Sequence, residues 1–183
     1  MSQLVDLAPL GANGELHVVV ECPRGATVKL KYEPRLRTMA VSRSLPLGLS
    51  YPFDWGFVPG TTAPDGDPLD ALALHDASTY PGVVLRCRPI GVVQLEQEAN
   101  RGGRERNDRI IAIPSWHDRM GELARATELP ERLRLEIEQF FLSTTFFTAK
   151  NPVILGWKNS RAAKLLVQAS VKNYRSRRKK SRA

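Results

Sequence analysis

The sequence of 183 residues has only two cysteines, few aromatic residues and no long apolar run. Its longest apolar segments, such as residues 18–20 and 83–85, are far too short to span a bilayer, which excludes a membrane-spanning helix. The first ten residues lack the basic start and the apolar stretch of a signal peptide. Cys22 and Cys87 have no metal-ligand spacing, so we expect buried thiols in a reducing compartment and assign the chain to the cytoplasm.

Positive charge is concentrated at the C-terminal end. Of the 27 Lys and Arg residues, seven lie from residue 172 onward, where there is no acidic residue, and the rest of the chain has 20 basic and 19 acidic residues. We therefore expect one domain over residues 1–171 and a basic disordered tail over residues 172–183. Such a tail can bind a nucleic acid through its phosphates, an alternative that we rank below a solvated end.

Several segments are rich in β-branched residues and bounded by Gly or Pro, which predicts strands. They are residues 16–21, 27–33, 38–43, 83–89 and 110–114. Residues 90–96 continue the fourth segment, but Pro89 has no N–H to donate and is expected to break the strand. Two polar stretches, residues 44–76 and 96–109, are expected to be long loops, which in a compact domain are either functional or disordered.

Two helices are expected toward the C-terminal end. The apolar positions of the first, which begins near Pro130, are Leu133, Ile137, Phe140 and Phe141. The second follows Asn159 or Ser160 as its N-cap. Its expected buried stripe is Ala162, Leu165, Leu166 and Ala169. Strands followed by helices predict an α+β fold, in which helices pack on the side of a small antiparallel barrel.

The strongest chemical signal is a cluster of three carboxylates, Asp65, Asp67 and Asp70, within six residues. Neighbouring carboxylates repel one another unless cations or donors offset them, and oxygen ligands of this kind suit Mg²⁺. The calcium loop of helix-loop-helix proteins is excluded, because Leu69 and Asp70 stand where it needs an oxygen ligand and a glycine. An aspartyl-phosphate site is disfavoured, because no buried apolar strand directly precedes the cluster. On spacing alone, a metal site and a solvated acidic turn fit equally well.

The segment DGDPLDA at residues 65–71 matches the signature of family I soluble inorganic pyrophosphatases at every position, and the chain resembles this family. Further matching segments follow in order and spacing. They are VVVECP around Glu21, KYE at residues 31–33, Arg43, YP at residues 51–52, WGFVPG, RCRPIGVV, LPERL and GWKNSRAA. The resemblance covers about residues 16–171 and implies a small five-stranded OB-like β-barrel with flanking α-helices.

The resemblance also implies Mg²⁺-dependent hydrolysis of pyrophosphate, or a related phosphoanhydride, by a metal-activated water. The implied direct metal ligands are Asp65 and Asp70, while Glu21 and Glu33 support the metal site and its waters. The implied catalytic residues are Asp67, which helps to deprotonate the water, Arg43 and Tyr51. The implied phosphate ligands are Lys31, Arg43 and Arg109. Bacterial members of this length form hexamers, so a homo-oligomer is implied as well.

Several positions depart from the family pattern. Gln97 and Asn107 stand where the family has acids, and Arg109 stands at a lysine position. A Tyr-Lys pair is replaced by Thr144-Thr145, and Trp55 replaces a tyrosine. Amides keep an acceptor oxygen but lose the negative charge that binds Mg²⁺. Asp108 is the best candidate for a compensating metal ligand, because it lies directly beside Asn107.

These replacements leave a second interpretation open. The chain can be a catalytically weakened pyrophosphatase-like protein that binds a phosphorylated ligand or acts as a scaffold. The arginines of residues 96–109 can then hold a polyphosphorylated ligand without help from one metal ion, or that stretch can be a solvated loop.

Overall fold

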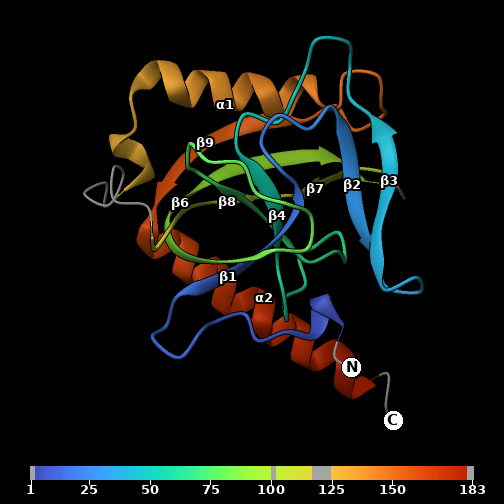
Figure 1. The fold of residues 1–183 in the computed structure, drawn as a ribbon, viewed down its shortest axis with the longest axis vertical. Coiled ribbons are helices and arrows are strands. Elements are labelled where there is room, and N and C mark those ends of the chain that lie inside the picture. The colour runs from blue at the N-terminus through green and yellow to red at the C-terminus, as the bar shows by residue number, and fades with distance from the viewer. Residues whose placement is uncertain (1–2, 100–101, 117–124, 181–183) are drawn as a thin grey trace.

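A computed structural model describes residues 3–99, 102–116 and 125–180 of the chain. In these residues a central sheet is flanked by a separate hairpin and by two α-helices on opposite sides (Figure 1). The central strands are β1 (Leu16–Cys22), β4 (Asp54–Val58), β5 (Leu69–Ala73), β6 (Val84–Glu98), β7 (Arg104–Arg106), β8 (Arg109–Pro114) and β9 (Val153–Asn159). The hairpin is β2 (Val28–Glu33) with β3 (Thr38–Ser44). The helices are α1 (Glu131–Ser143) and α2 (Ser160–Lys180), with 3₁₀ turns at Leu4–Asp6 and Ala126–Glu128.

Five of the central strands close into a ring in the order β1-β4-β5-β8-β6, because β6 also pairs with β1. The β5–β8 pairing is parallel, and the other pairings of the ring are antiparallel. Closure of the ring leaves no open sheet edge within it. The predicted five-stranded barrel with flanking helices is confirmed, except that one of its pairings is parallel.

The two helices cover different parts of the apolar core. Ile137, Phe140 and Phe141 of α1 pack with one set of buried strand residues, as the sequence spacing predicted. Ala163 and Val167 of α2 pack with the other set. All five residues of β4 are buried, because apolar groups cover it on both sides. Gly56 is required there, since a Cβ atom would lie 1.9 Å from the carbonyl oxygen of Val19.

The buried face of α2 differs from the predicted stripe. Ala163, Val167 and Ser170 are its buried residues, whereas Leu165 is 58% exposed. The N-cap prediction is confirmed, because the Asn159 side chain accepts a hydrogen bond from the backbone N–H of Ala162. No helix among the described residues is long and apolar enough to cross a membrane.

The C-terminal basic segment is helical up to Lys180, where the sequence predicted a disordered tail. This correction has a physical reason: the segment contains no Gly or Pro to end the helix, and its side chains find partners. Arg178 and Tyr174 both bind the carboxylate of Asp6. Residues 181–183 lie outside the described residues, and the predicted domain boundary at residue 171 stays a prediction.

Strands also occur where loops or breaks were expected. The stretch over residues 44–76 contains β4 and β5, and β9 was not predicted at all. Strand β6 continues through Pro89, with a register shift between Pro89 and Gly91 that absorbs the missing N–H. The two cysteines are free and buried, as predicted.

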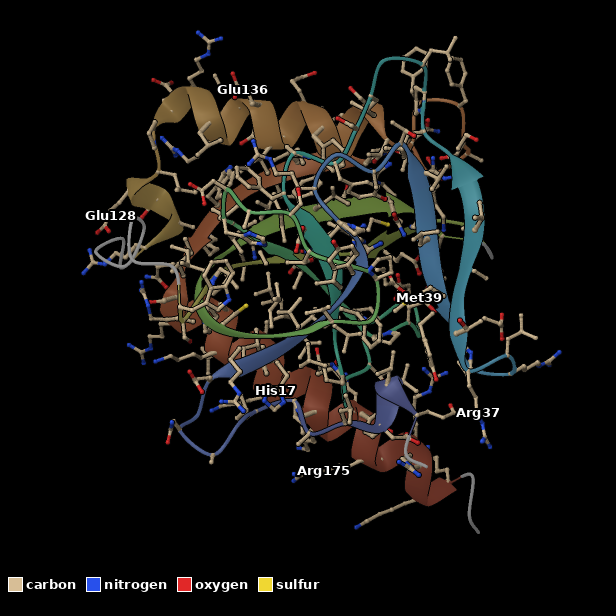
Figure 2. The ribbon with its side chains drawn as sticks, in the orientation of Figure 1. His17, Arg37, Met39, Glu128, Glu136 and Arg175 are labelled. Carbon is tan, nitrogen blue, oxygen red and sulfur yellow. The ribbon has the colours of Figure 1, made fainter. Side chains whose placement is uncertain are left out.

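The β2–β3 hairpin stands beside the ring and is attached to it along β2, where the Leu30 and Tyr32 N–H groups donate to Cys22 and Glu21 of β1. Tyr32 and Met39 pack with Val19 and Phe57, and Figure 2 shows Met39 directed toward the barrel. At the turn between the strands, Arg37 has a positive φ of 55° and points away from the molecule (Figure 2). The charged faces of this hairpin and of the ring enclose the site described below.

Candidate active site

A cavity of about 620 Å³ lies between the hairpin and the ring. Its charged lining residues are Glu21, Lys29, Lys31, Glu33, Arg43, Asp65, Asp67, Asp70, Arg109 and Lys150. Five of these ten are acidic and five are basic. A cavity with both charges in equal number can hold a cation through its acids and an anion through its bases.

The acidic side of the cavity is a loop over residues 59–68, between β4 and β5. The hydroxyl of Thr61 donates to the Val58 carbonyl at 2.5 Å and accepts from the Leu69 N–H at 2.9 Å, which fixes both ends of the loop. The Asp65 carboxylate accepts from the Asp67 N–H at 3.1 Å, and Gly66 between them has a φ of 92° that favours glycine. The turn thereby presents both carboxylates to the cavity.

The carboxylates of this loop differ in their surroundings. Asp67 is paired with Lys31 of β2, with 2.7 Å between Lys31 Nζ and the carboxylate, and both side chains are about half exposed. Burial lowers the pKa of Lys31, but the hydrogen bond and the charge of Asp67 outweigh this effect and raise it overall. Burial raises the pKa of Asp65. Lys31 and Asp67 therefore form a charged pair that a substrate can reach.

Asp70, the third carboxylate, is paired with Arg109 at the start of β8. The same guanidinium group donates to Asn107 Oδ1 at 2.5 Å, and its carbon lies 5.1 Å from the centre of the Trp55 ring. Burial lowers the pKa of Arg109 to about 10, so the group stays charged at neutral pH. Arg109 and Trp55, both of which depart from the family pattern, are thus in contact.

Gln97 and Asn107, which stand at the two expected acid positions, both line the cavity and are only 5% and 7% exposed. Asn107 accepts from Arg109, as described, and Gln97 Nε2 donates to Glu105 at 3.4 Å. Both residues therefore lie at the cavity, as their expected positions predicted. Their uncharged amides face the ligand space where two carboxylates were expected.

Asp108, the expected substitute for a missing acid, lies away from the cavity. Its carboxylate binds the Arg106 guanidinium in a two-pronged contact and accepts from the Leu95 N–H at 3.1 Å. It is not among the residues that line the cavity. Asn107 and Arg109 take the cavity side, and Asp108 between them points to the other side. The role of Asp108 as a substitute metal ligand therefore stays a prediction that this geometry does not favour.

Glu21 and Glu33 both line the cavity, in line with the supporting role expected of them. Glu21 is 6% exposed and accepts from the Tyr32 N–H at 2.8 Å, and burial raises its pKa. Glu33 accepts from the Arg35 N–H at 3.1 Å. Both of these hydrogen bonds come from backbone N–H groups, so they do not pair either carboxylate with a cation.

Tyr51 lines a smaller neighbouring cavity of about 40 Å³, together with Arg43 and Arg109. Its hydroxyl is hydrogen-bonded to Cys22, and burial raises the pKa of Tyr51. Thr144 and Thr145 also line this smaller cavity, and Thr145 lines the large one as well. Tyr51 is thus beside the large cavity rather than in its wall, while Arg43 belongs to both.

Lys29 is a cavity residue that the sequence analysis did not select. It lines both cavities, and burial followed by the charge of Arg109 lowers its pKa. Lys29 lies directly opposite Arg43 across the β2–β3 hairpin, so two cations face each other. The signal was present in the sequence, because Lys29 and Lys31 are two residues apart on one strand and share a face.

The oxygen ligands available decide where a divalent metal ion fits. The described ranges contain no group of three or more His, Cys, Asp or Glu residues placed to hold a metal ion. Asp65 and Asp67 fit a hydrated Mg²⁺, which needs one or two carboxylates and completes its shell with water and substrate phosphates. A metal ion between Asp70 and Asn107 does not fit, because both side chains bind Arg109.

Comparison with known proteins decides the family. A family model described as "Inorganic pyrophosphatase" matches residues 18–175. The chain belongs to the inorganic pyrophosphatase family. It is 35% identical over 162 residues to the inorganic pyrophosphatase of Synechocystis sp., covering 88% of this chain and 93% of that one. The relative from Thermus thermophilus is 34% identical over 163 residues, covering 87% and 90% of the two chains.

The solved structures agree with this assignment. The crystal structure of inorganic pyrophosphatase from Thermus thermophilus matches with a TM-score of 0.86 at 32% identity, covering 95% of this chain and 99% of that one. An inorganic pyrophosphatase from Neisseria gonorrhoeae matches with a TM-score of 0.82 at 27% identity, covering 92% and 96%. The family that the DGDPLDA segment suggested is therefore confirmed over nearly the whole chain.

Proposed function

We propose that the chain hydrolyses inorganic pyrophosphate to two phosphates with the help of Mg²⁺. The observation that carries this proposal is the cavity in which Asp65, Asp67 and Asp70 face the hairpin cations. Lys29 and Arg43, opposite each other on the hairpin, repel one another in the free protein, and an anion between them removes this repulsion. Membership in the pyrophosphatase family supports the same substrate.

In this proposal each half of the cavity has a separate task. Asp65 and Asp67 hold Mg²⁺, which supplies charge neutralisation and lowers the pKa of a bound water. Asp67 accepts a proton from the attacking water, and its contact with Lys31 is exchanged for contacts with the ligand. Lys29, Lys31 and Arg43 bind the phosphate oxygens, and Tyr51 supports Arg43 from the smaller cavity.

A steady-state assay tests this proposal. Phosphate release from pyrophosphate is measured over a range of Mg²⁺ and Mn²⁺ concentrations for the full chain, for Asp65→Ala and for Glu136→Gln. The control, Glu136, is an exposed residue of α1 that lies far from the cavity lining (Figure 2). We expect metal-dependent release that Asp65→Ala abolishes, because Asp65 is a proposed Mg²⁺ ligand, and that Glu136→Gln leaves unchanged. Release no greater than in buffer at high Mg²⁺ or Mn²⁺ would refute hydrolysis.

The second candidate function is binding of a phosphorylated ligand with little turnover. Gln97 and Asn107 favour it, because both face the ligand space without the charge that helps a metal ion to activate water. Calorimetry with pyrophosphate and with nucleotides separates the two candidates: binding with little phosphate release supports the second, and fast turnover rules it out. The homo-hexamer and the cytoplasmic location stay predictions, and sedimentation of the full chain checks the first of them. Nucleic-acid binding by the basic end of α2 also stays a prediction.

A further inference from the structure

Arg109 is a cavity cation whose side chain is largely withdrawn from solvent. Only 12% of its side chain is exposed, against 49% for Lys31. A guanidinium group in such a place is costly unless an acid and hydrogen-bond acceptors surround it. The role of Arg109 in the site therefore depends on these partners.

Those partners are oxygen atoms that a divalent cation would otherwise use. Arg109 Nη1 is bound both to the Asp70 carboxylate and to Asn107 Oδ1, and the guanidinium carbon lies above the Trp55 ring. Two oxygens at Nη1 and the aromatic face of Trp55 hold the planar cation, while Arg109 Nε is buried without a hydrogen-bond partner among the described residues. These contacts occupy Asp70 Oδ2 and Asn107 Oδ1, so Arg109 Nη1 stands between the two oxygens that a metal ion would bridge.

The charges of the cavity make this arrangement useful for an anion. Its five acidic and five basic residues balance, so that a polyanionic ligand brings excess negative charge. A bound metal ion offsets part of this excess, but its presence depends on the metal concentration. A guanidinium group held by the protein is always present.

We propose that Arg109 is a built-in cation of this site, taking the place of a divalent ion between Asp70 and Asn107. The cavity then binds metal only on the Asp65–Asp67 side, and it retains affinity for a phosphoanhydride-like anion when divalent metal is removed. This inference rests on the proposed function for the class of ligand and specifies how that ligand's charge is offset. It concerns binding and does not require turnover.

Two binding measurements test the inference without an activity assay. The first is the number of Mn²⁺ ions bound per chain, followed by electron paramagnetic resonance. The second is the affinity for methylenediphosphonate, a pyrophosphate mimic that cannot be hydrolysed, in EDTA and in saturating Mg²⁺. The variants are Arg109→Gln, which removes the charge, and Arg109→Lys, which keeps it. The matched control is Arg106→Gln, because Arg106 is three residues away and pairs with Asp108 outside the cavity.

The expected results differ clearly between the variants. Arg109→Gln gains one Mn²⁺ per chain and loses at least about tenfold in diphosphonate affinity in EDTA, the effect of one lost charge-assisted contact. Arg109→Lys keeps most of that affinity, and Arg106→Gln behaves as the wild type. Unchanged Mn²⁺ number and unchanged affinity in Arg109→Gln would overturn the inference.

The wild-type chain alone gives a further decision if the Arg109 variants unfold. Failure to bind methylenediphosphonate in EDTA, with binding restored by Mg²⁺, would also overturn the inference, because Arg109 would then not suffice as a cation. The proposed function fails separately. If the diphosphonate binds as expected but pyrophosphate releases no phosphate, the proposed hydrolysis is refuted and the role of Arg109 is retained. If the chain hydrolyses pyrophosphate with metal but does not bind the diphosphonate in EDTA, the role of Arg109 is refuted and the hydrolysis is retained.

Discussion

The two sides of the cavity contrast in how they meet a cation. The loop over residues 59–68 presents Asp65 and Asp67 on a turn fixed by Thr61, with carboxylates that solvent and ligand can reach. The side formed by the end of β6 and the start of β8 presents two amides, Gln97 and Asn107, and a buried arginine. In the proposals above, one side exchanges a metal ion with solvent, and the other has its positive charge built into the chain. Family membership is thus compatible with a changed charge arrangement at the centre of the site.

The largest expected effect comes from the loop side. Asp67→Asn keeps the shape and the hydrogen-bond acceptor but removes the charge that accepts a proton from water. If Asp67 acts as the base, phosphate release falls by roughly 100- to 10,000-fold, the range of general-base contributions. A steady-state assay at saturating Mg²⁺ measures this loss. A loss of less than about threefold would mean that the base lies elsewhere and would remove this half of the comparison.

The second-largest expected effect comes from adding acids to the β6–β8 side, so that it resembles the loop side. The double variant Gln97→Asp, Asn107→Asp adds two carboxylates to the cavity wall, so Mg²⁺ affinity rises by roughly 10- to 100-fold, the effect of a charged in place of a neutral acceptor. Phosphate release rises with it, while diphosphonate binding in EDTA weakens because the cavity gains negative charge. Metal titration by calorimetry measures the change.

The control for this variant is Gln94→Asp on the same strand. Gln94 is partly buried and does not line the cavity, so the added carboxylate should leave Mg²⁺ affinity unchanged. An equal gain in both variants would show that net charge, and not the position of the acids, controls metal binding.

The sequence predicted one side of the site far better than the other. Asp65, Asp67 and Asp70 were found because a turn of consecutive residues carries its geometry within a short motif. The pairing of Asp70 with Arg109 joins positions 39 residues apart on neighbouring parallel strands, and no local pattern encodes it. The position of Asp108 away from the cavity could have been predicted, because alternation of side chains in extended backbone places Asn107 and Arg109 on one face and Asp108 on the other.

The same distinction between local and distant determinants explains the fold predictions. Strands β1, β2, β3 and β8 and both helices have a composition or a spacing that reveals them. Strands β4 and β5 were expected to be loop because Gly56 and several aspartates resemble turn residues in sequence. Their burial between the two apolar sets makes them strands, and this tertiary effect is invisible to local propensity.

A buried carboxylate predicts a smaller, pH-dependent effect. Burial raises the pKa of Glu21, so its ionised form is disfavoured in the folded state. The resulting penalty is absent below pH 4.5, its ordinary pKa, where the group is protonated in both states, and it is fully present above the raised pKa. Glu21→Gln keeps the acceptor for the Tyr32 N–H. It should raise the free energy of unfolding at pH 7 by on the order of 1 kcal/mol.

Thermal unfolding at pH 7 and at pH 4 measures this effect. The gain should be present at pH 7 and largely absent at pH 4, while phosphate release at pH 7 decreases because a supporting carboxylate is lost. An equal gain in stability at both pH values would mean that the gain comes from packing and not from the removed charge. The charge of Glu21 would then have no effect on stability.

The smallest expected effect comes from the hydrogen bonds between α2 and the loop over residues 59–68. Arg177 near the end of α2 donates to the Gly66 carbonyl at 3.0 Å, and the Thr62 N–H donates to the Ser170 carbonyl of the same helix at 3.0 Å. Because Arg177 is exposed, Arg177→Ala should change stability by less than about 0.5 kcal/mol. The Mg²⁺ concentration for half-maximal activity should rise by roughly two- to threefold, since one hydrogen bond to the loop is worth about 0.5–1 kcal/mol.

The matched control is Arg175→Ala, because Arg175 carries the same charge on the same helix and points outward, away from the loop (Figure 2). Only Arg177→Ala should shift the Mg²⁺ dependence, with kcat at saturating Mg²⁺ nearly unchanged. Equal shifts in both variants would mean that the positive charge of α2 acts through its general field. In that case the hydrogen bond from Arg177 does not position Asp65 and Asp67. The geometry of the metal-binding side would then be set by the loop over residues 59–68 alone.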